Sequence, residues 1–127
     1  MMDMNNLNCI FCKEEYLLIK NEFAYAIFDK FPVTKFHALI ISKRHVETFF
    51  ELTPSEKISC FDLLGQVKEK LVQMDTTISG FNVGFNSGKD AGQTIMHCHI
   101  HLIPRREGDV IEPQGGIRNI IPGKGKY

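Results

Sequence analysis

The spacing of apolar residues predicts one long helix in the middle of the chain. Thr53 is followed at once by Pro54 and three residues on by Glu56, which is the pattern of a capping box with proline in the first helical turn. Apolar residues then recur three or four positions apart, so we expect a helix over residues 54–73. Its apolar stripe is predicted to consist of Ile58, Phe61, Leu64, Val67 and Leu71. A shorter turn of helix is expected to start at Ser42 and to carry residues 45–50.

Short segments rich in aromatic and β-branched residues predict the strands. Four of them lie at 23–28, 36–41, 81–86 and 95–104, and residues 16–19 are a weaker fifth. Only one long helix lies between strands, so the regular alternation of a doubly wound fold is not expected. The order favours an α+β domain with a mainly antiparallel sheet.

The chain of 127 residues has the size of one compact domain. We expect a single domain over 1–127, with a core at about 9–105. Prolines and glycines interrupt residues 106–127 too often for a regular element, so this tail is expected to be an irregular strap on the domain or a partly mobile end. A hydrophobic content of 43% is ordinary for a globular protein.

Charge and composition exclude several classes of partner. Fifteen basic and fifteen acidic side chains give a formal net charge of zero, so we expect no binding to nucleic acid or to anionic membranes. The N-terminus has no signal-peptide pattern, and no segment approaches the ~20 apolar residues of a membrane span. The expected location is cytoplasmic, where a close cysteine pair is expected to bind metal or do redox chemistry rather than form a disulfide.

The stretch MHCHIHLI, residues 96–103, places three of the five histidines at every second position. Alternate residues of a strand share a face, roughly 6.5 to 7 Å apart, so His97, His99 and His101 are predicted to point the same way. The residues between them are expected to face the core: Met96, Cys98, Ile100 and Leu102. Clustered imidazoles repel when protonated, so stability gives no reason to collect them, and the row indicates a functional site. The three rings could bind a catalytic metal, or one could act as a nucleophile that its neighbours orient.

Cys9 and Cys12 have the two-residue gap that lets both thiolates bind one zinc ion, but they supply only half of a tetrahedral shell. His45 and one member of the histidine row are the natural candidates for the other half. A closed shell of two cysteines and two histidines is structural, because it leaves no position for water or substrate. If His97 completes the shell, His99 remains available to attack phosphorus, and the polar loop 86–94 offers hydrogen-bond donors to the phosphate oxygens.

Taken together, these motifs resemble the histidine triad (HIT) family of nucleotide hydrolases and transferases, in its zinc-containing bacterial form. The likeness rests on HCHIHLI at 97–103, CIFC at 9–12, IFDKFPVTKFHALIISKRH at 27–45 and NSGKDAGQT at 86–94, and it covers about residues 9–105. It implies a HIT-like α+β fold with a five-stranded, mainly antiparallel sheet, one long helix and one short helix. It also implies a homodimer that binds purine mononucleotides and cleaves their derivatives at the α-phosphate.

The resemblance also implies a role for each site residue. His99 would be the nucleophile that forms a nucleotidyl-histidine intermediate, which water later releases, while His101 and His37 would orient it and engage the phosphate. Structural zinc would be held by Cys9, Cys12, His45 and His97. Nucleotide binding would fall to Asp29 at the ribose hydroxyls, to Ile27 and Phe28 at the base, and to Asn86, Gly92, Gln93 and Thr94 at the phosphate and leaving-group side, with Gln93 and Thr94 acting through their side chains.

Several alternatives remain open from the sequence. The favoured substrate is a dinucleoside polyphosphate such as diadenosine tetraphosphate, because Arg105, Arg106 and Arg118 are expected within reach of the pocket mouth. Phosphoramidate hydrolysis and nucleotidyl transfer are the alternatives for the leaving group. A nucleotide- and zinc-binding module used for sensing or protein interaction is the alternative of another class. A further one is a hydrolase in which all three histidines of the row bind a catalytic metal. Cys60 and Cys98 are expected to be small core residues.

Overall fold

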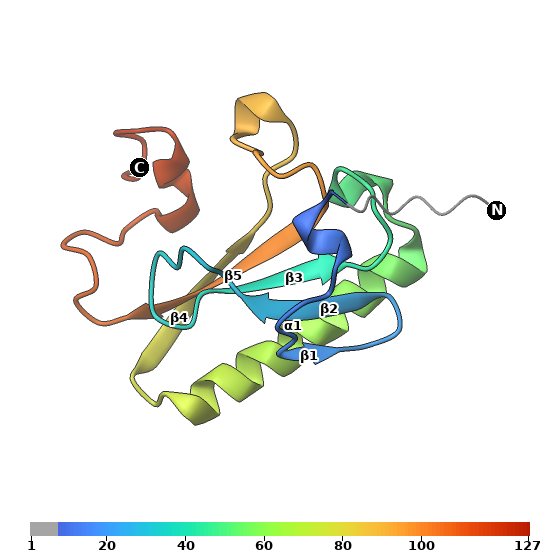
Figure 1. Cartoon of the computed structure of the whole chain (residues 1–127). Helices are drawn as coiled ribbons and strands as arrows, with labels where there is room; N and C mark the ends of the chain where they lie inside the picture. The colour runs from blue at the N-terminus through green and yellow to red at the C-terminus, as the bar shows by residue number, and fades with distance from the viewer. Residues whose placement is uncertain (1–7) are drawn as a thin grey trace.

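The computed structural model describes residues 8–127, and residues 1–7, which hold most of the N-terminal stretch searched for a targeting pattern, lie outside the described residues. Residues 8–127 contain one antiparallel sheet, with the strand order β1-β2-β3-β5-β4, and a single α-helix, α1 (Pro54–Met74), which lies across one of its faces (Figure 1). The strands are β1 (Ile19–Lys20), β2 (Ala24–Phe28), β3 (Ala38–Ser42), β4 (Ile78–Gly84) and β5 (His99–Arg106). Four short 3-10 helices complete the fold: η1 (Ile10–Cys12), η2 (Phe49–Glu51), η3 (Lys89–Ala91) and η4 (Gly116–Ile120). The predicted α+β architecture is confirmed.

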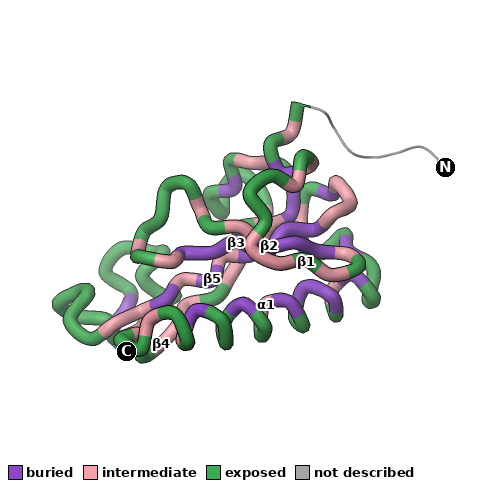
Figure 2. Tube along the Cα trace, turned by 60° about the horizontal axis from the view of Figure 1, so that its bottom comes forward, coloured by how far each residue is buried: buried purple, intermediate pink, exposed green. Residues whose placement is uncertain are grey.

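The long helix begins where its capping signal predicts. The hydroxyl of Thr53 accepts a hydrogen bond from the Glu56 amide at 3.2 Å, and the Glu56 carboxylate accepts one from the Thr53 amide at 2.8 Å. The buried stripe differs from the predicted one, since it consists of Cys60, Leu63, Val67 and Leu71 (Figure 2). Ile58 and Phe61, which were expected in the core, are 61% and 55% exposed. The predicted and observed stripes share Val67 and Leu71 and differ towards the start of the helix, where the sheet covers Cys60 and Leu63 instead of Ile58 and Phe61.

The central strands β2 and β3 are buried on both faces. Alternate residues pack against α1, and those between them form a second cluster on the opposite face with Phe11 of the N-terminal segment: Tyr25, Leu39 and Ile41. The N-terminal segment therefore lies against the face of the sheet that α1 does not cover. Among residues 8–127, no helix combines the length and apolarity that crossing a membrane requires.

Two predicted boundaries near the histidines were wrong. Residues 95–97 form a bend and β5 starts only at His99, so His97 lies ahead of the strand. Met96 is 41% exposed, whereas the other three residues expected in the core are buried: Cys98, Ile100 and Leu102. The chain after Ser42 is irregular until η2, so His45 lies on an irregular connection instead of a helical turn.

Candidate active site

Cys9 and Cys12 meet His45 and His97 beside the start of β5. Cys9 precedes η1 and Cys12 ends it, and one ligand atom from each of the four residues lies within 4.8 Å of the others. The Cys12 Sγ atom is 3.2 Å from Nδ1 of His45 and 3.4 Å from Nδ1 of His97. The Cys9 Sγ atom is 3.3 Å from Nδ1 of His97, and the two Nδ1 atoms are 3.1 Å apart. We refer to these four residues as the metal group.

These separations are close to the edges of a tetrahedral zinc shell. With Zn–S bonds of ~2.3 Å and Zn–N bonds of ~2.0–2.1 Å, the S···N edges are about 3.6 Å and the N···N edges about 3.3 Å. The Nε2–H of His97 donates to the carbonyl oxygen of Ser42 at 2.6 Å, so its Nδ1 lone pair faces the cysteines. Burial lowers the pKa of His97 to about 4, which keeps this ring neutral. The residues of the metal group therefore fit a metal ion with four protein ligands.

His99 differs from His97 in its partners. Its Nδ1–H donates to the backbone carbonyl of His97 at 2.7 Å, so the lone pair of the neutral ring is on Nε2. The ring packs edge-on against Phe11, with centroids 5.0 Å apart, and lies 5.2 Å from the ring of His101. One nitrogen held by a carbonyl and the other available as a base or nucleophile is the state that covalent catalysis by histidine needs.

Asp29, His37 and His101 form a second cluster, the relay cluster. The amide of Val33 donates to Nδ1 of His37 at 3.1 Å, so the proton of this ring is on Nε2, which lies 2.9 Å from Nδ1 of His101. The same Nε2 is 3.5 Å from Oδ2 of Asp29. Burial lowers the pKa of both rings, that of His101 to about 4, so both are neutral at pH 7. Neutral His101 therefore carries its proton on Nε2.

The spacing of the relay cluster could also accommodate a metal ion, but the hydrogen bond between its rings already accounts for the orientation of His37 and His101. His97, His99 and His101 each have a different partner: the metal group, a backbone carbonyl and His37. This arrangement contradicts the alternative in which the three histidines of the row share one catalytic metal.

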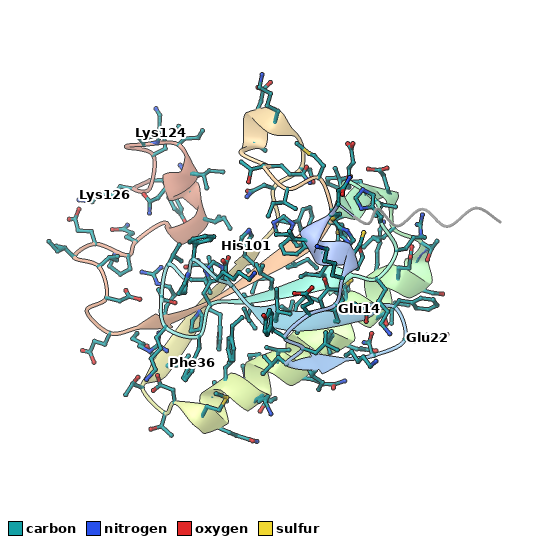
Figure 3. The ribbon with its side chains drawn as sticks, in the orientation of Figure 1. Glu14, Glu22, Phe36, His101, Lys124 and Lys126 are labelled. Atoms are coloured by element: carbon teal, nitrogen blue, oxygen red, sulfur yellow. The ribbon has the colours of Figure 1, made fainter. Side chains whose placement is uncertain are left out.

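Two cavities flank the histidines on the face of the sheet opposite α1, where Figure 3 shows His101. Strand pairing explains this placement, because Ile27, Leu39, His101 and Gly84 are paired in one row across the sheet. The β2–β3 cavity, of about 220 Å³, is lined by aromatic and aliphatic side chains and by four charged ones, Lys13, Glu15, Asp29 and Lys30. The β4–β5 cavity, of about 310 Å³, is lined by His37, His101 and Asn86 among others.

The two residues predicted to bind the base lie on opposite faces of the sheet. Ile27 lines the β2–β3 cavity together with Asp29, the residue predicted at the ribose. Phe28 is wrong for this role, because side chains alternate along β2 and its ring faces the α1 side, where it packs against Phe36 with centroids 5.6 Å apart.

The polar loop 86–94 uses more of its hydrogen-bonding groups within the protein than the sequence suggested. Gln93 is only 4% exposed, and its side chain accepts from the Gly88 amide and donates to the carbonyls of Glu47 and Ile95. The amide of Gly92 donates to the carbonyl of Lys89. The Gln93 side chain and the Gly92 amide therefore shape the loop, and their predicted contacts with phosphate are corrected.

Asn86 and Thr94 occupy the two ends of this loop, and both are exposed. Asn86 also lines the β4–β5 cavity, next to His101. These two side chains are the loop's remaining candidates for contacts with the phosphate oxygens.

The three arginines expected at the pocket mouth bind elsewhere: Arg105, Arg106 and Arg118. The guanidinium of Arg105 pairs with both carboxylate oxygens of Asp109 at 2.8 Å, and that of Arg106 pairs with Asp75 at 2.9 Å. Arg118 lies over the ring of Tyr127, 4.4 Å from its centroid. Within the described chain, no arginine lines either cavity. The three arginines therefore give no support to a polyphosphate substrate, and the identity of the leaving group stays a prediction.

Two contributors to the site were missed from the sequence. Phe11 lines the β2–β3 cavity and also contacts His99, and the Ser42 carbonyl orients His97. Phe11 could have been inferred, since it lies between the cysteines and any metal bound there brings its ring to the histidines. The Ser42 carbonyl carries no sequence signal.

Comparison with known proteins identifies the family. The profile of the HIT domain matches residues 12–108, which include both cavities' strands and the histidine row. The chain belongs to the HIT family. An uncharacterized HIT-like protein of Methanocaldococcus jannaschii is 34% identical over 119 residues, covering 88% of this chain and 91% of that one. The crystal structure of a HIT family protein from Bacillus anthracis matches with a TM-score of 0.73 at 35% identity, over 80% of this chain and 76% of that one.

Two further relatives of this HIT protein are named for an activity. The asymmetrical bis(5'-nucleosyl)-tetraphosphatase of Schizosaccharomyces pombe is 37% identical over 81 residues, which cover 64% of this chain and 44% of that protein. The adenosine 5'-monophosphoramidase of Saccharomyces cerevisiae is 35% identical over 105 residues, covering 78% of this chain and 63% of that protein. The two names refer to different leaving groups, so membership of the family does not determine which one this chain accepts.

Proposed function

We propose that this protein hydrolyses nucleoside 5'-phosphate derivatives at the α-phosphate through a nucleotidyl intermediate on His99. One observation carries the proposal: the hydrogen bond from Nδ1 of His99 to the His97 carbonyl leaves the Nε2 lone pair on the face that holds both cavities. Relatives named as a tetraphosphatase and a phosphoramidase support the reaction class.

The β2–β3 cavity is suited to the nucleoside. Its aromatic and aliphatic lining favours the faces of a base, and the carboxylate of Asp29 at its wall can accept hydrogen bonds from ribose hydroxyls. Oδ1 of Asp29 accepts from the Phe31 amide at 2.8 Å, which holds the carboxylate in place. A nucleoside bound there directs its 5'-phosphate towards the neighbouring row of histidines.

The chemistry then has two steps. Nε2 of His99 attacks phosphorus, and a nitrogen–phosphorus bond forms as the bond to the leaving group breaks. The leaving group departs with that electron pair and takes up a proton. Water next attacks the phosphorus, breaks the bond to His99 and releases the nucleoside monophosphate. His101, with its proton on Nε2, donates to the phosphate oxygens as their charge increases.

Mass spectrometry of the intact protein tests this proposal. After brief exposure to adenosine 5'-phosphoramidate, the wild type is expected to gain one adenylyl group, and peptide mapping is expected to locate it on His99. His99→Gly is expected to gain none, whereas Ile111→Ala, a control at a residue that is 98% exposed and lines neither cavity, is expected to gain one. An equal adduct in His99→Gly contradicts the assignment. Nucleotide binding without adduct or turnover would instead identify the chain as a binding module.

We propose zinc as the ion of the metal group, with a structural role. Two thiolates and two imidazoles are a donor set that zinc prefers, and four protein ligands leave no position for substrate. The bound ion would fasten the N-terminal segment, and Phe11 with it, to the end of the sheet. Elemental analysis of purified protein is expected to find about one zinc per chain, and iron or no metal would contradict the proposal.

We also propose that two copies pair through β4. Within residues 8–127, β4 forms one edge of the sheet and pairs only with β5, and Phe85 follows it directly. Phe85 stacks on Phe49, and Phe50 and Phe61 extend the same cluster with 70% and 55% of their surfaces exposed. An exposed strand edge beside an aromatic patch favours a second copy as the partner.

Sedimentation equilibrium tests the pairing. The wild type is expected to sediment as a dimer and Phe61→Asp as a monomer. Ile111→Asp, at a residue that is 98% exposed outside the patch, is the matched control and is expected to remain dimeric. A monomeric wild type contradicts the proposal.

A further inference from the structure

One wall of the β2–β3 cavity is formed by the residues that directly follow η1, here termed the rim segment (residues 13–16). Three of its side chains line the cavity: Lys13, Glu15 and Tyr16. In Figure 1 the chain runs from η1 across β2 to β1, so the rim segment lies on the side of the cavity away from β5 and its histidines. A ligand that extends from the histidine row into this cavity therefore meets the rim segment with its far end.

The backbone of the rim segment has an uncommon conformation. Glu14 has a φ of 49° and Tyr16 a φ of 59°, although neither residue is a glycine. This left-handed region is strained for residues that carry a Cβ atom, and strained residues gather at binding and active sites. Lys30, which follows β2, lies 5.7 Å from the centroid of the Tyr16 ring. The strained turn places Glu15, between its two left-handed residues, at the cavity wall.

The charged side chains of the rim segment that line the cavity are available to a ligand. Lys13 and Glu15 are both exposed, and neither forms an ion pair with any residue of the described chain. Much of the remaining wall is apolar, with Phe11, Ile27 and Leu39 among its residues. Such a cavity suits a ligand that has apolar faces and a polar edge, and a purine base has both.

The edge of the base that faces the rim segment distinguishes the two common purines. With the ribose at Asp29 and the phosphate at the histidine row, the six-membered ring of the base points towards Lys13 and Glu15. On guanine this edge carries the O6 acceptor and two adjacent donors, N1–H and N2–H, which the two oxygens of one carboxylate can accept side by side. On adenine it carries one donor beside the N1 lone pair, which would repel the second carboxylate oxygen.

We propose that the rim segment recognises the base, and that Glu15 and Lys13 select guanine over adenine nucleotides. The carboxylate of Glu15 would accept from N1–H and N2–H, and the ammonium group of Lys13 would donate to O6. Adenosine derivatives would still bind through the apolar walls and Asp29, but would lack these contacts. This inference rests on the proposed function and specifies the nucleoside of its substrate.

The 5'-phosphoramidates of guanosine, inosine and adenosine test the assignment, since inosine has O6 and N1–H but lacks N2–H. For the wild type, kcat/KM is expected to be about tenfold higher for guanosine than for adenosine, with inosine between them. In Glu15→Gln this guanosine-to-adenosine ratio is expected to fall to about one. The change should appear in KM, because a base contact stabilises substrate and transition state alike. Glu14→Gln, at the neighbouring carboxylate that does not line the cavity, is the matched control and is expected to keep the wild-type ratio.

Calorimetric titration with the two product monophosphates measures the same preference without turnover. The wild type is expected to bind guanosine 5'-monophosphate about tenfold more tightly than adenosine 5'-monophosphate, and Lys13→Met is expected to narrow this difference. Equal affinities, equal turnover of the two phosphoramidates, or a wild-type ratio in Glu15→Gln overturns the role of the rim segment. The absence of both turnover and an adduct on His99 with all three phosphoramidates contradicts the proposed function instead, and the titration then still decides whether the rim segment selects guanine.

Discussion

The metal group and the relay cluster both contain histidines of one short row, yet they differ in the groups that contact the two nitrogens of each ring. In the metal group, Nδ1 of His97 faces two thiolates and His45, and its Nε2 is held by a carbonyl. In the relay cluster, Nδ1 of His101 accepts a hydrogen bond from Nε2–H of His37, and the ring lines a cavity. Identical side chains four residues apart thus acquire different chemistry from the groups their two nitrogens bond to. One cluster should therefore determine stability and the other activity.

Removing the metal group should give the largest effect. Cys9→Ala, Cys12→Ala is expected to lose the bound metal and on the order of 4 kcal/mol of unfolding free energy, because binding energy at a structural site is folding energy. Urea denaturation with and without a chelator measures this. The wild type treated with chelator should match the variant, while His101→Asn should retain its metal. Unchanged stability after chelation would refute the structural role.

Altering the relay cluster should lower activity instead. In His101→Asn, the side-chain oxygen can still accept the hydrogen bond from His37, but the proton on Nε2 is gone. We expect kcat to fall roughly 10²–10³-fold with stability at pH 7 retained. Steady-state kinetics and urea denaturation on the same preparation separate the two effects. A fall in stability comparable to the loss of activity would show that the two clusters do not divide their roles.

The pH dependence of stability should distinguish the clusters next. Burial lowers the pKa of folded His101 to about 4, against about 6.5 in an unfolded chain. Between these values the unfolded state binds more protons, so the unfolding free energy falls as the pH decreases from 6.5 to 4. The contribution of this ring is about 2 kcal/mol between pH 7 and pH 5. Urea denaturation at both values should show this difference in the wild type and a correspondingly smaller one in His101→Asn. Equal pH dependence in the two proteins would contradict the burial of a neutral ring.

The smallest effect concerns the support of the metal group. The hydroxyl of Tyr25 donates to the Phe11 carbonyl and so holds η1 against β2. Tyr25→Phe is expected to cost about 1 kcal/mol, because a buried carbonyl loses its donor, while the metal stays bound. Tyr16→Phe, at a residue that is 80% exposed, serves as the control and should change little. Loss of metal from Tyr25→Phe would mean that the hydroxyl does more than support η1.

The sequence predicted best the features that depend on residues close together in the chain. The cap of α1 was located correctly, because its hydrogen bonds join residues three apart. The buried face of α1 was predicted correctly only towards its end, at Val67 and Leu71; near its start, contact with the sheet decides that Cys60 and Leu63 are buried while Ile58 and Phe61 are exposed. The start of β5 was predicted too early, since alternation continues through His97 although the chain bends there.

The candidate site shows the same limit. The residue types in the loop suggested donors for phosphate, but the fold uses the Gln93 side chain and the Gly92 amide internally. Phe28 suited a base pocket by type and faces the other side of the sheet. The arginines after the histidine row found carboxylate and aromatic partners that no spacing rule predicts.

By itself, the sequence determined the chemistry that this chain can carry out. A two-residue cysteine gap, alternating histidines and a capped helix are short-range patterns, and short-range geometry converts them directly into ligands, a row of rings and a helix. Only the tertiary structure decided which ring serves which purpose. Those assignments depend on contacts between residues up to 88 positions apart, such as Cys9 with His97. The C-terminal segment forms a wall of the β4–β5 cavity for the same reason, because Ile117 and Ile120 line that cavity only where η4 packs beside Gly84 of β4.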